Sequence, residues 1–205
     1  MPTFFIKLQQ LLDRSRGVDF IAPLLMRLYL VPVFWMAGIQ KFNNFGDTVE
    51  WFGNAEWGLG LPLPAVMAFL ATAAELGGAI LLALGLAVRW ISLPLMATML
   101  VAMFTVHWQH GWLAIAEAAG PLANQRTMEA VMRLQEVRAI LKEHGDYDYL
   151  TEHGSVVILN NGIEFAATYF VLLLSLFFVG GGRWVSIDYW LQRRWMPQSS
   201  MGLRV

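Results

Sequence analysis

Four apolar stretches, each about as long as a membrane-spanning helix, constrain this chain more than any other feature. They cover about residues 20–42, 65–88, 90–110 and 157–180. A helix needs about 20 mostly apolar residues to cross a hydrocarbon core about 30 Å thick. Charged residues make up only 14% of the chain, against about 25% in soluble proteins, which excludes an ordinary soluble domain. The sequence predicts a single all-α membrane domain over residues 1–205, built as a bundle of four transmembrane helices.

Two further helices are expected outside the spans. Before the first span, apolar residues at helical spacing, with basic residues among them, predict an N-terminal helix in the membrane interface and no cleavable signal peptide. Between the third and fourth spans, the outer insert (about residues 111–155) predicts a surface helix capped by Asn124 or Thr127 and ended by Gly145. Its expected apolar stripe consists of Met128, Val131, Leu134, Val137 and Leu141.

The distribution of basic residues predicts the orientation of the spans. Lysine and arginine concentrate on the cytoplasmic side of membrane proteins. Here they precede the first span, lie between the second and third, and follow the fourth, as Lys7, Arg14, Arg16, Arg89, Arg183, Arg193 and Arg194. We therefore expect a multi-pass protein of the bacterial inner membrane with both termini cytoplasmic. The lipid bilayer is one partner, and no nucleic-acid partner is expected.

Glu75 is the only charged residue between Glu56 and Arg89. An ionised carboxylate near the bilayer centre costs about 2.5 to 3.5 kcal/mol on insertion scales, so a partner is expected. Arg27 of the first span lies at a compatible depth, and we predict a direct or water-mediated contact with Glu75. The alternative is that this pair only clamps the two helices. Lys41 shares a helix face with Arg27 and is either a site residue or an anchor at the membrane boundary.

The fourth stretch carries polar residues at helical spacing, namely Asn161, Glu164, Thr168 and Ser175. Glu164 would be a second carboxylate at membrane depth; alternatively, the span begins later and Glu164 is interfacial. On the second stretch, the small residues of Ala73–Gly77 and Ala74–Gly78 have the four-residue spacing that lets another helix approach closely.

All four histidines fall at or beyond the end of the third span, and His107 and His110 are three residues apart. That spacing lets both rings face one direction. Together with nearby carboxylates they could bind a divalent metal such as copper; the alternatives are a proton-transfer or quinone-contact role, or a purely structural one. The chain has no cysteine, which excludes thiolate and iron–sulfur chemistry, and no heme pair or flavin motif is evident.

An ordered set of short motifs resembles the DoxX family of small four-helix bacterial membrane proteins. The set comprises Arg27, Gly38-Ile39-Gln40-Lys41-Phe42, Thr48-Val49-Glu50-Trp51-Phe52, Gly60-Leu61-Pro62-Leu63-Pro64, Ala74-Glu75-Leu76-Gly77-Gly78, Leu81-Leu82-Ala83-Leu84-Gly85-Leu86 and Arg89. The resemblance implies a membrane component of redox systems, like those of thiosulfate:quinone oxidoreductase, of an oxidative-stress complex, or of systems that make copper-binding peptides. By position it implies an intramembrane site of Arg27, Lys41, Glu75 and His107. The 111–155 insert departs from the family pattern.

These features together suggest the membrane subunit of a quinone-linked redox system. The chain would be an oxidoreductase subunit that is incomplete alone, because electrons must come from a periplasmic or membrane redox partner. The expected proton-carrying residues are Glu75, His107 and Glu164, and the expected quinone-binding residues are Arg27, Lys41 and Asn161. Two alternatives remain: a scaffold for a periplasmic partner, or a metal-handling accessory protein with copper at His107 and His110.

Overall fold

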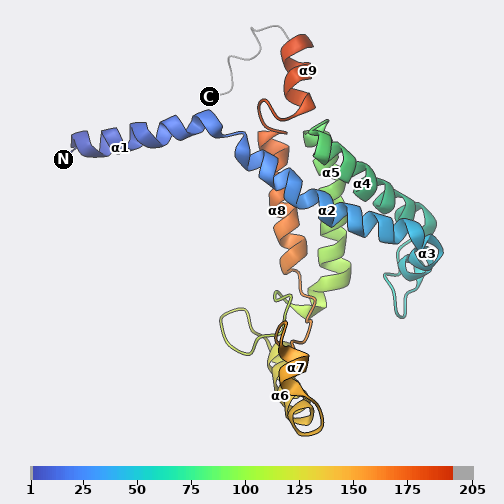
Figure 1. Cartoon of the computed structure of the whole chain (residues 1–205). Helices are drawn as coiled ribbons and strands as arrows, with labels where there is room; N and C mark the ends of the chain where they lie inside the picture. The colour runs from blue at the N-terminus through green and yellow to red at the C-terminus, as the bar shows by residue number, and fades with distance from the viewer. Residues whose placement is uncertain (1, 196–205) are drawn as a thin grey trace. The chain divides into compact units, whose positions relative to one another are not determined.

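A computed structural model describes residues 2–195 of the chain, and its regular elements are all helical (Figure 1). In order they are α1 (Pro2–Arg14), η1 (Ser15–Val18), α2 (Ile21–Asn43), α3 (Phe45–Gly53), α4 (Pro64–Leu84), α5 (Val88–Val101), η2 (Ala102–His107), η3 (Trp108–His110), α6 (Gln125–His144), α7 (Tyr147–Thr151), α8 (Glu164–Val179) and α9 (Ile187–Trp195). Within the described residues the β-type pairing is limited to an isolated antiparallel bridge between Ile115 and Leu159. The prediction of an all-α protein is confirmed.

The described residues form two compact units, which we treat separately. The first unit contains residues 2–98 and 171–195, and the second contains residues 99–170. Helices α2, α3, α4 and α9 therefore belong to the first unit, and α6 and α7 to the second.

Among residues 2–195, three helical stretches are long and apolar enough to cross a membrane, as expected of an integral membrane protein. They are Ile21–Asn43, Pro64–Leu84 and Val88–His110, close to the first three predicted spans. The fourth apolar helix, α8, has 16 residues, fewer than the 20 or so that a span needs. The fourth span therefore stays a prediction.

Helix α8 begins later than the sequence suggested because the residues before it pair with the segment that follows η3. The amides of Asn160 and Asn161 both donate to the Ala114 carbonyl, each at 2.9 Å, and the Glu164 amide donates to the Trp112 carbonyl at 3.0 Å. Backbone groups in such a pairing are unavailable for an earlier helical turn. Asn161 consequently lies outside the helix, with φ of +61°, and its predicted place in a helical polar stripe is wrong.

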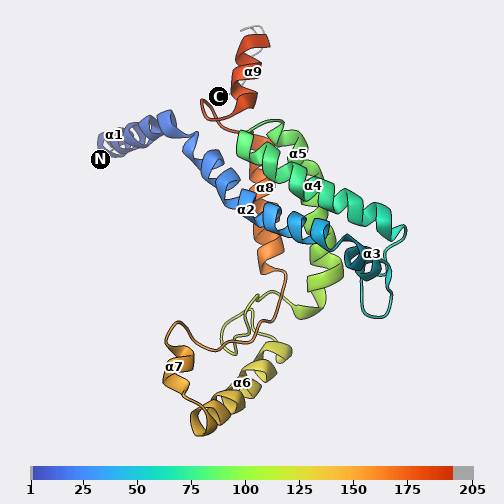
Figure 2. The same ribbon diagram turned by 45° about the vertical axis from the view of Figure 1, so that its right-hand side comes forward.

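The core of the first unit forms where α2 packs against α4 (Figure 2). Its fully or almost fully buried apolar residues include Leu30, Phe34, Ala68, Ala79 and Leu82. Gly38 permits the close approach, because a Cβ at this position would lie 2.8 Å from Leu76 Cγ. Gly78 likewise faces Leu95 of α5, so close packing at the predicted small-residue spacing is confirmed there. A Cβ at Gly77 would meet no described atom within 4 Å.

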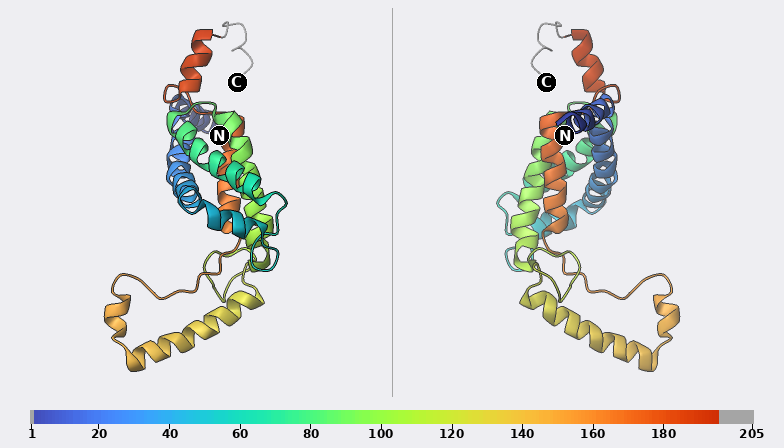
Figure 3. Two further views of the ribbon diagram at one scale, coloured as in Figure 1. Left: turned by 90° about the vertical axis from the view of Figure 1, so that its right-hand side faces the viewer. Right: turned by 90° about the vertical axis from the view of Figure 1, so that its left-hand side faces the viewer.

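A network of polar contacts joins the ends of several helices in the first unit. Gly85 ends α4 with φ of +65°, a left-handed conformation that glycine adopts without strain. The Asp188 carboxylate then accepts hydrogen bonds from the amides of Ala87 and Val88, at 2.7 and 2.9 Å, where α5 begins. Arg89 Nε donates to the Phe177 carbonyl at 2.8 Å, and Figure 3 shows α5 and α8 side by side.

Two smaller helices flank this core. Helix α3, which the sequence analysis did not predict, packs against α4 and buries Phe52. Helix α1 confirms the predicted N-terminal helix and runs outward from the start of α2 (Figure 1). Its apolar side chains are exposed at Phe4, Phe5, Leu8, Leu11 and Leu12. This exposure is consistent with an interfacial position, which stays a prediction.

The insert helix α6 begins and ends as its sequence predicts. The Asn124 side chain accepts from the Thr127 amide at 2.9 Å, and the Thr127 hydroxyl accepts from the Asn124 amide at 3.0 Å, which forms a capping box. Gly145 follows the last residue. Of the predicted apolar stripe, Leu134 is buried, whereas Met128 and Val137 are exposed.

Loss of the cap should destabilise α6 locally. We expect Asn124→Ala to reduce the stability of its first turn by about 1 kcal/mol, because the Thr127 amide loses its side-chain acceptor. Hydrogen exchange of the amides in residues 125–129 would then be about fivefold faster, with exchange in α4 unchanged as the internal control. Unchanged protection in the first turn of α6 would contradict the assignment of this cap.

Candidate functional site

Glu75 is paired with Lys41 in the interior of the first unit. Lys41 Nζ lies 3.0 Å from Oε1 and 2.8 Å from Oε2 of Glu75. Lys41 comes from the last turn of α2, and Glu75 from the middle of α4. The lysine side chain is 24% exposed and the glutamate side chain 5% exposed. The glutamate side chain is therefore buried, while the lysine side chain is partly exposed.

The predicted contact between Arg27 and Glu75 is wrong, and the register of α2 against α4 explains why. Gly38 lies opposite Leu76, which places Glu75 close to the level of Gly38 in the antiparallel pair. Arg27 is eleven residues earlier on α2, about 16 Å along the helix axis. An arginine side chain does not span that distance, whereas Lys41 is less than one turn beyond Gly38.

Arg27 instead joins three segments at the far end of α4. Its guanidinium donates to the Leu82 carbonyl from Nη1 at 3.0 Å and to the Val185 carbonyl from Nη2 at 2.9 Å. The residue is 1% exposed. Leu82 lies in the last turn of α4, where carbonyls have no partner within the helix and carry the negative end of the helix dipole. Arg27 thus serves as a clamp at this position, as the alternative interpretation of its role anticipated, but with backbone partners.

The geometry of the Lys41–Glu75 pair leaves donor capacity on the lysine. An ammonium group has three N–H donors, and the contacts with Glu75 use two of them. A neighbouring polar group, Thr72, donates its hydroxyl to the Ala68 carbonyl at 2.7 Å. Lys41 can therefore donate one further hydrogen bond, with the Glu75 carboxylate beside it.

His107 and His110 converge on one atom in the second unit. The Nδ1 atoms of the two rings lie 2.8 and 3.1 Å from the carbonyl oxygen of Asn161. This confirms that both rings face one direction. His107 is the last residue of a π-helical turn, a form of helix that is often found at functional sites. Asn161 contributes its backbone oxygen to this contact.

Glu164 and Asn160 organise the segment around these histidines. Glu164 begins α8, and its Oε2 accepts from the Ala114 amide at 2.9 Å. The Asn160 side chain, which the sequence analysis missed, donates to the carbonyls of His110 and Leu113 at 2.9 and 2.6 Å. The consecutive residues Asn160, Asn161 and Gly162 within an apolar stretch are the signal that could have revealed it, because such residues favour turns over helix interiors.

Among residues 2–195, no group of three or more histidine, aspartate or glutamate side chains is arranged to hold a metal ion. His107 and His110 could contribute at most two imidazole ligands, and any further ligands would have to come from water or from another molecule. Carboxylates of the insert, which the sequence suggested as co-ligands, do not complete such a group in the described part of the chain.

Comparison with known proteins gives two matches. The family model named DoxX matches residues 22–108, a range that includes Arg27, Lys41, Glu75 and His107 but not His110, Asn161 or Glu164. A Bacillus subtilis (strain 168) protein named "Putative oxidoreductase CatD" is 31% identical over 97 residues, which cover 47% of this chain and 68% of that protein. No solved structure matches.

Proposed function

Because this chain belongs to the DoxX family of membrane proteins, we propose that it is the membrane subunit of a quinone-linked redox system, with Lys41 and Glu75 at the quinone site. The supporting observation is the buried carboxylate of Glu75, bonded to a lysine that is still 24% exposed. The name of the similar B. subtilis protein supports redox chemistry. The distribution of basic residues supports a bacterial inner membrane location with both termini in the cytoplasm.

The proposed chemistry assigns a separate role to each member of the pair. Reduction of a quinone to a quinol consumes two electrons and two protons, and a partner redox protein supplies the electrons. Lys41 donates a hydrogen bond to one quinone carbonyl and stabilises the negative charge that develops there. One proton passes from the Lys41 ammonium to the reduced quinone oxygen, and Glu75 takes up a proton from water and returns it to the Lys41 amine. The second proton of the quinol comes from water. His107 and Glu164, in the second unit, are the proposed groups for proton exchange with water.

Quinone binding to the purified full chain tests this proposal. In lipid nanodiscs, we expect Lys41→Gln to weaken the binding of a soluble quinone analogue about tenfold or more, because a charge-assisted hydrogen bond is lost. Binding would be measured by quenching of tryptophan fluorescence or by retention of the quinone on the protein. Lys7→Gln, a change of an exposed lysine on α1, is the matched control and should bind as the unmodified chain does.

The charge-exchanged variant Lys41→Glu/Glu75→Lys separates chemistry from stability. It retains an ion pair between α2 and α4 but moves the donor to the buried position, so we expect a folded protein that binds quinone poorly. If this variant and Lys41→Gln both bind quinone normally, the proposal is wrong. The pair would then hold the helices together, as expected for a scaffold.

A further inference from the structure

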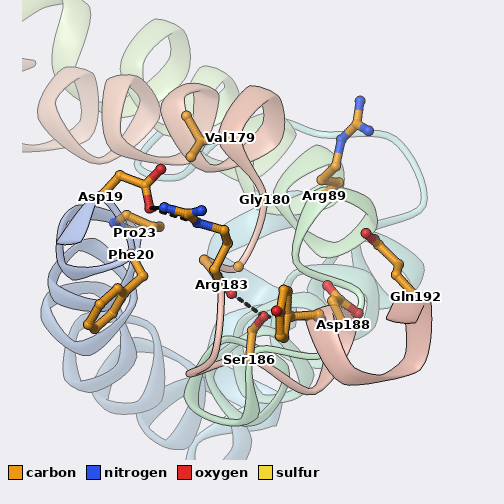
Figure 4. A pocket seen from close by; sticks show the side chains of 13 residues that line it. Asp19, Phe20, Pro23, Arg89, Val179, Gly180, Arg183, Ser186, Asp188 and Gln192 are labelled. Atoms are coloured by element: carbon orange, nitrogen blue, oxygen red, sulfur yellow. Dashed lines mark hydrogen bonds and ion pairs between the residues drawn. The ribbon is translucent and has the colours of Figure 1, made fainter. Parts of the chain in front are cut away.

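A cavity of about 180 Å³ lies in the first unit beside the loop that joins α8 to α9 (Figure 4). It is distinct from the Lys41–Glu75 pair, since neither residue lines it. Helix α2 begins at this end of the unit and α8 ends here, as the lining residues Phe20, Pro23 and Val179 show. Because apolar helices start and stop at this level, the cavity lies where a bilayer changes from hydrocarbon to headgroups.

The loop beside the cavity presents backbone amides without acceptors. Gly180 and Gly182 have φ of +82° and +90°, whereas Gly181 does not have a positive φ. Successive residues that alternate in this way direct consecutive N–H groups into a concave nest, which suits an anion. Within residues 2–195, the amides of Gly181, Gly182 and Arg183 donate to no protein acceptor. All three residues line the cavity.

Two arginines supply positive charge, and the carboxylates nearby already have partners. Arg183 donates to Asp19 from Nε and Nη2, at 3.0 and 2.7 Å, and Asp188 accepts from the amides that start α5. Arg89 Nε donates to the Phe177 carbonyl, and its guanidinium lies over the Phe177 ring, 5.5 Å from the centroid. Figure 4 shows this guanidinium at the rim, directed away from Arg183. Within residues 2–195, Nη1 of Arg183 and both Nη atoms of Arg89 donate to no protein acceptor.

Exposed tryptophans surround the same end of the unit. They are Trp90 on α5, Trp184 in the loop, and Trp190 and Trp195 on α9. Tryptophan is enriched at the depth of lipid headgroups, where its ring and its N–H meet different environments. The ligand of the cavity is thus expected to combine an anionic group with an apolar part.

We propose that this cavity binds the phosphate group of an anionic glycerophospholipid. The free amides of the glycine loop and the Arg183 guanidinium bind the phosphate oxygens, while Arg89 at the rim adds positive charge that attracts the phosphate. Phe20, Pro23 and Val179 contact the glycerol and the first acyl carbons. Arginine pairs well with phosphate because its planar donors match two oxygens at once. The membrane leaflet that carries anionic lipids would supply the ligand.

Lipid binding to the full chain in detergent micelles tests the proposal. Native mass spectrometry would measure the affinity for phosphatidylglycerol, with phosphatidylcholine, glycerol phosphate and inorganic phosphate as separate arms. We expect phosphatidylglycerol to bind most tightly, and Arg89→Gln/Arg183→Gln to weaken it by about tenfold or more. Arg89→Gln alone should give a smaller loss and leaves the Arg183–Asp19 pair intact, so it remains informative if the double variant folds poorly.

The matched control removes two charges from the same end of the protein but outside the cavity. Arg193→Gln/Arg194→Gln, on exposed residues of the last turn of α9, should change phosphatidylglycerol affinity by less than about twofold, because distant charges are screened by salt. If the control variant loses as much phosphatidylglycerol affinity as Arg89→Gln/Arg183→Gln, the effect is a nonspecific attraction between charges, and the proposed site is wrong. Equal binding of phosphatidylcholine, or inorganic phosphate bound as tightly as phosphatidylglycerol, would also overturn it.

Discussion

Replacing Lys41 with methionine should lower the free energy of unfolding by about 3 to 5 kcal/mol, because it leaves the Glu75 carboxylate buried without its partner. The glutamate side chain is 5% exposed, and Lys41 donates a hydrogen bond to each of its two carboxylate oxygens. Unfolding by sodium dodecyl sulfate in mixed micelles would measure the change. Lys7→Met, an exposed substitution of the same type, should stay within about 0.5 kcal/mol of the unmodified chain.

The double variant Lys41→Met/Glu75→Leu should recover most of the lost stability. Well-packed apolar residues often replace a buried ion pair without loss, because the cost of desolvating two charges disappears. We expect a double-mutant cycle to give a coupling energy of at least about 2 kcal/mol between the two positions. Additive effects of the single substitutions would show that the contact between Lys41 and Glu75 contributes nothing to folding. If Lys41 and Glu75 form the quinone site, the double variant should be stable but should not bind quinone.

Arg27→Met should have the second large effect, a loss of about 3 kcal/mol or more. Two hydrogen bonds from a charged donor disappear, and such bonds contribute about 1.5 to 3 kcal/mol each. The acceptors left behind are the carbonyls of Leu82 and Val185. The same unfolding experiment applies, with Arg133→Met on the surface of α6 as the control, since its side chain is 77% exposed.

Gly85→Ala provides an independent check of the Arg27 clamp. A Cβ at position 85 would occupy the place of Arg27 Nη1 and would also strain a backbone with φ of +65°. We expect it to destabilise the first unit in the same direction, and less than additively with Arg27→Met, because both changes break the same contacts. If Arg27→Met instead leaves stability unchanged and abolishes quinone binding, Arg27 belongs to the substrate site rather than to the clamp.

Local sequence patterns predicted most of the long helices correctly. The apolar runs predicted α2, α4 and the α5–η3 stretch, and Asn124 and Gly145 marked the two ends of α6. These features depend on residues close together in the chain, so the sequence displays them directly. Helix α3 was missed because it lies in a connection that has no spanning length, although its Phe52 becomes buried against α4.

The partner of Glu75 was missed for a different reason. Periodicity shows which face of a helix a residue occupies, and Arg27 and Lys41 share such a face, but it does not show how far one helix slides along another. Gly38 opposite Leu76 sets that register, and it selects Lys41. The start of α8 also depends on a contact between distant segments, the pairing of Asn160 and Asn161 with Ala114. The local sequence does not show such a long-range pairing directly. Its only local sign is the run of turn-forming residues Asn160, Asn161 and Gly162 within an apolar stretch.

The carbonyl of Asn161 determines which tautomer each of its two histidines adopts. A carbonyl oxygen can only accept, so His107 and His110 must both carry hydrogen on Nδ1 to bond with it at 2.8 and 3.1 Å. Each Nε2 then holds a lone pair in the neutral ring. A proton that arrives at either ring binds there without breaking the bond to Asn161. The hydrogen bonds from the two rings to Asn161, which connect η2–η3 to the segment before α8, are thus retained whether or not Nε2 carries a proton.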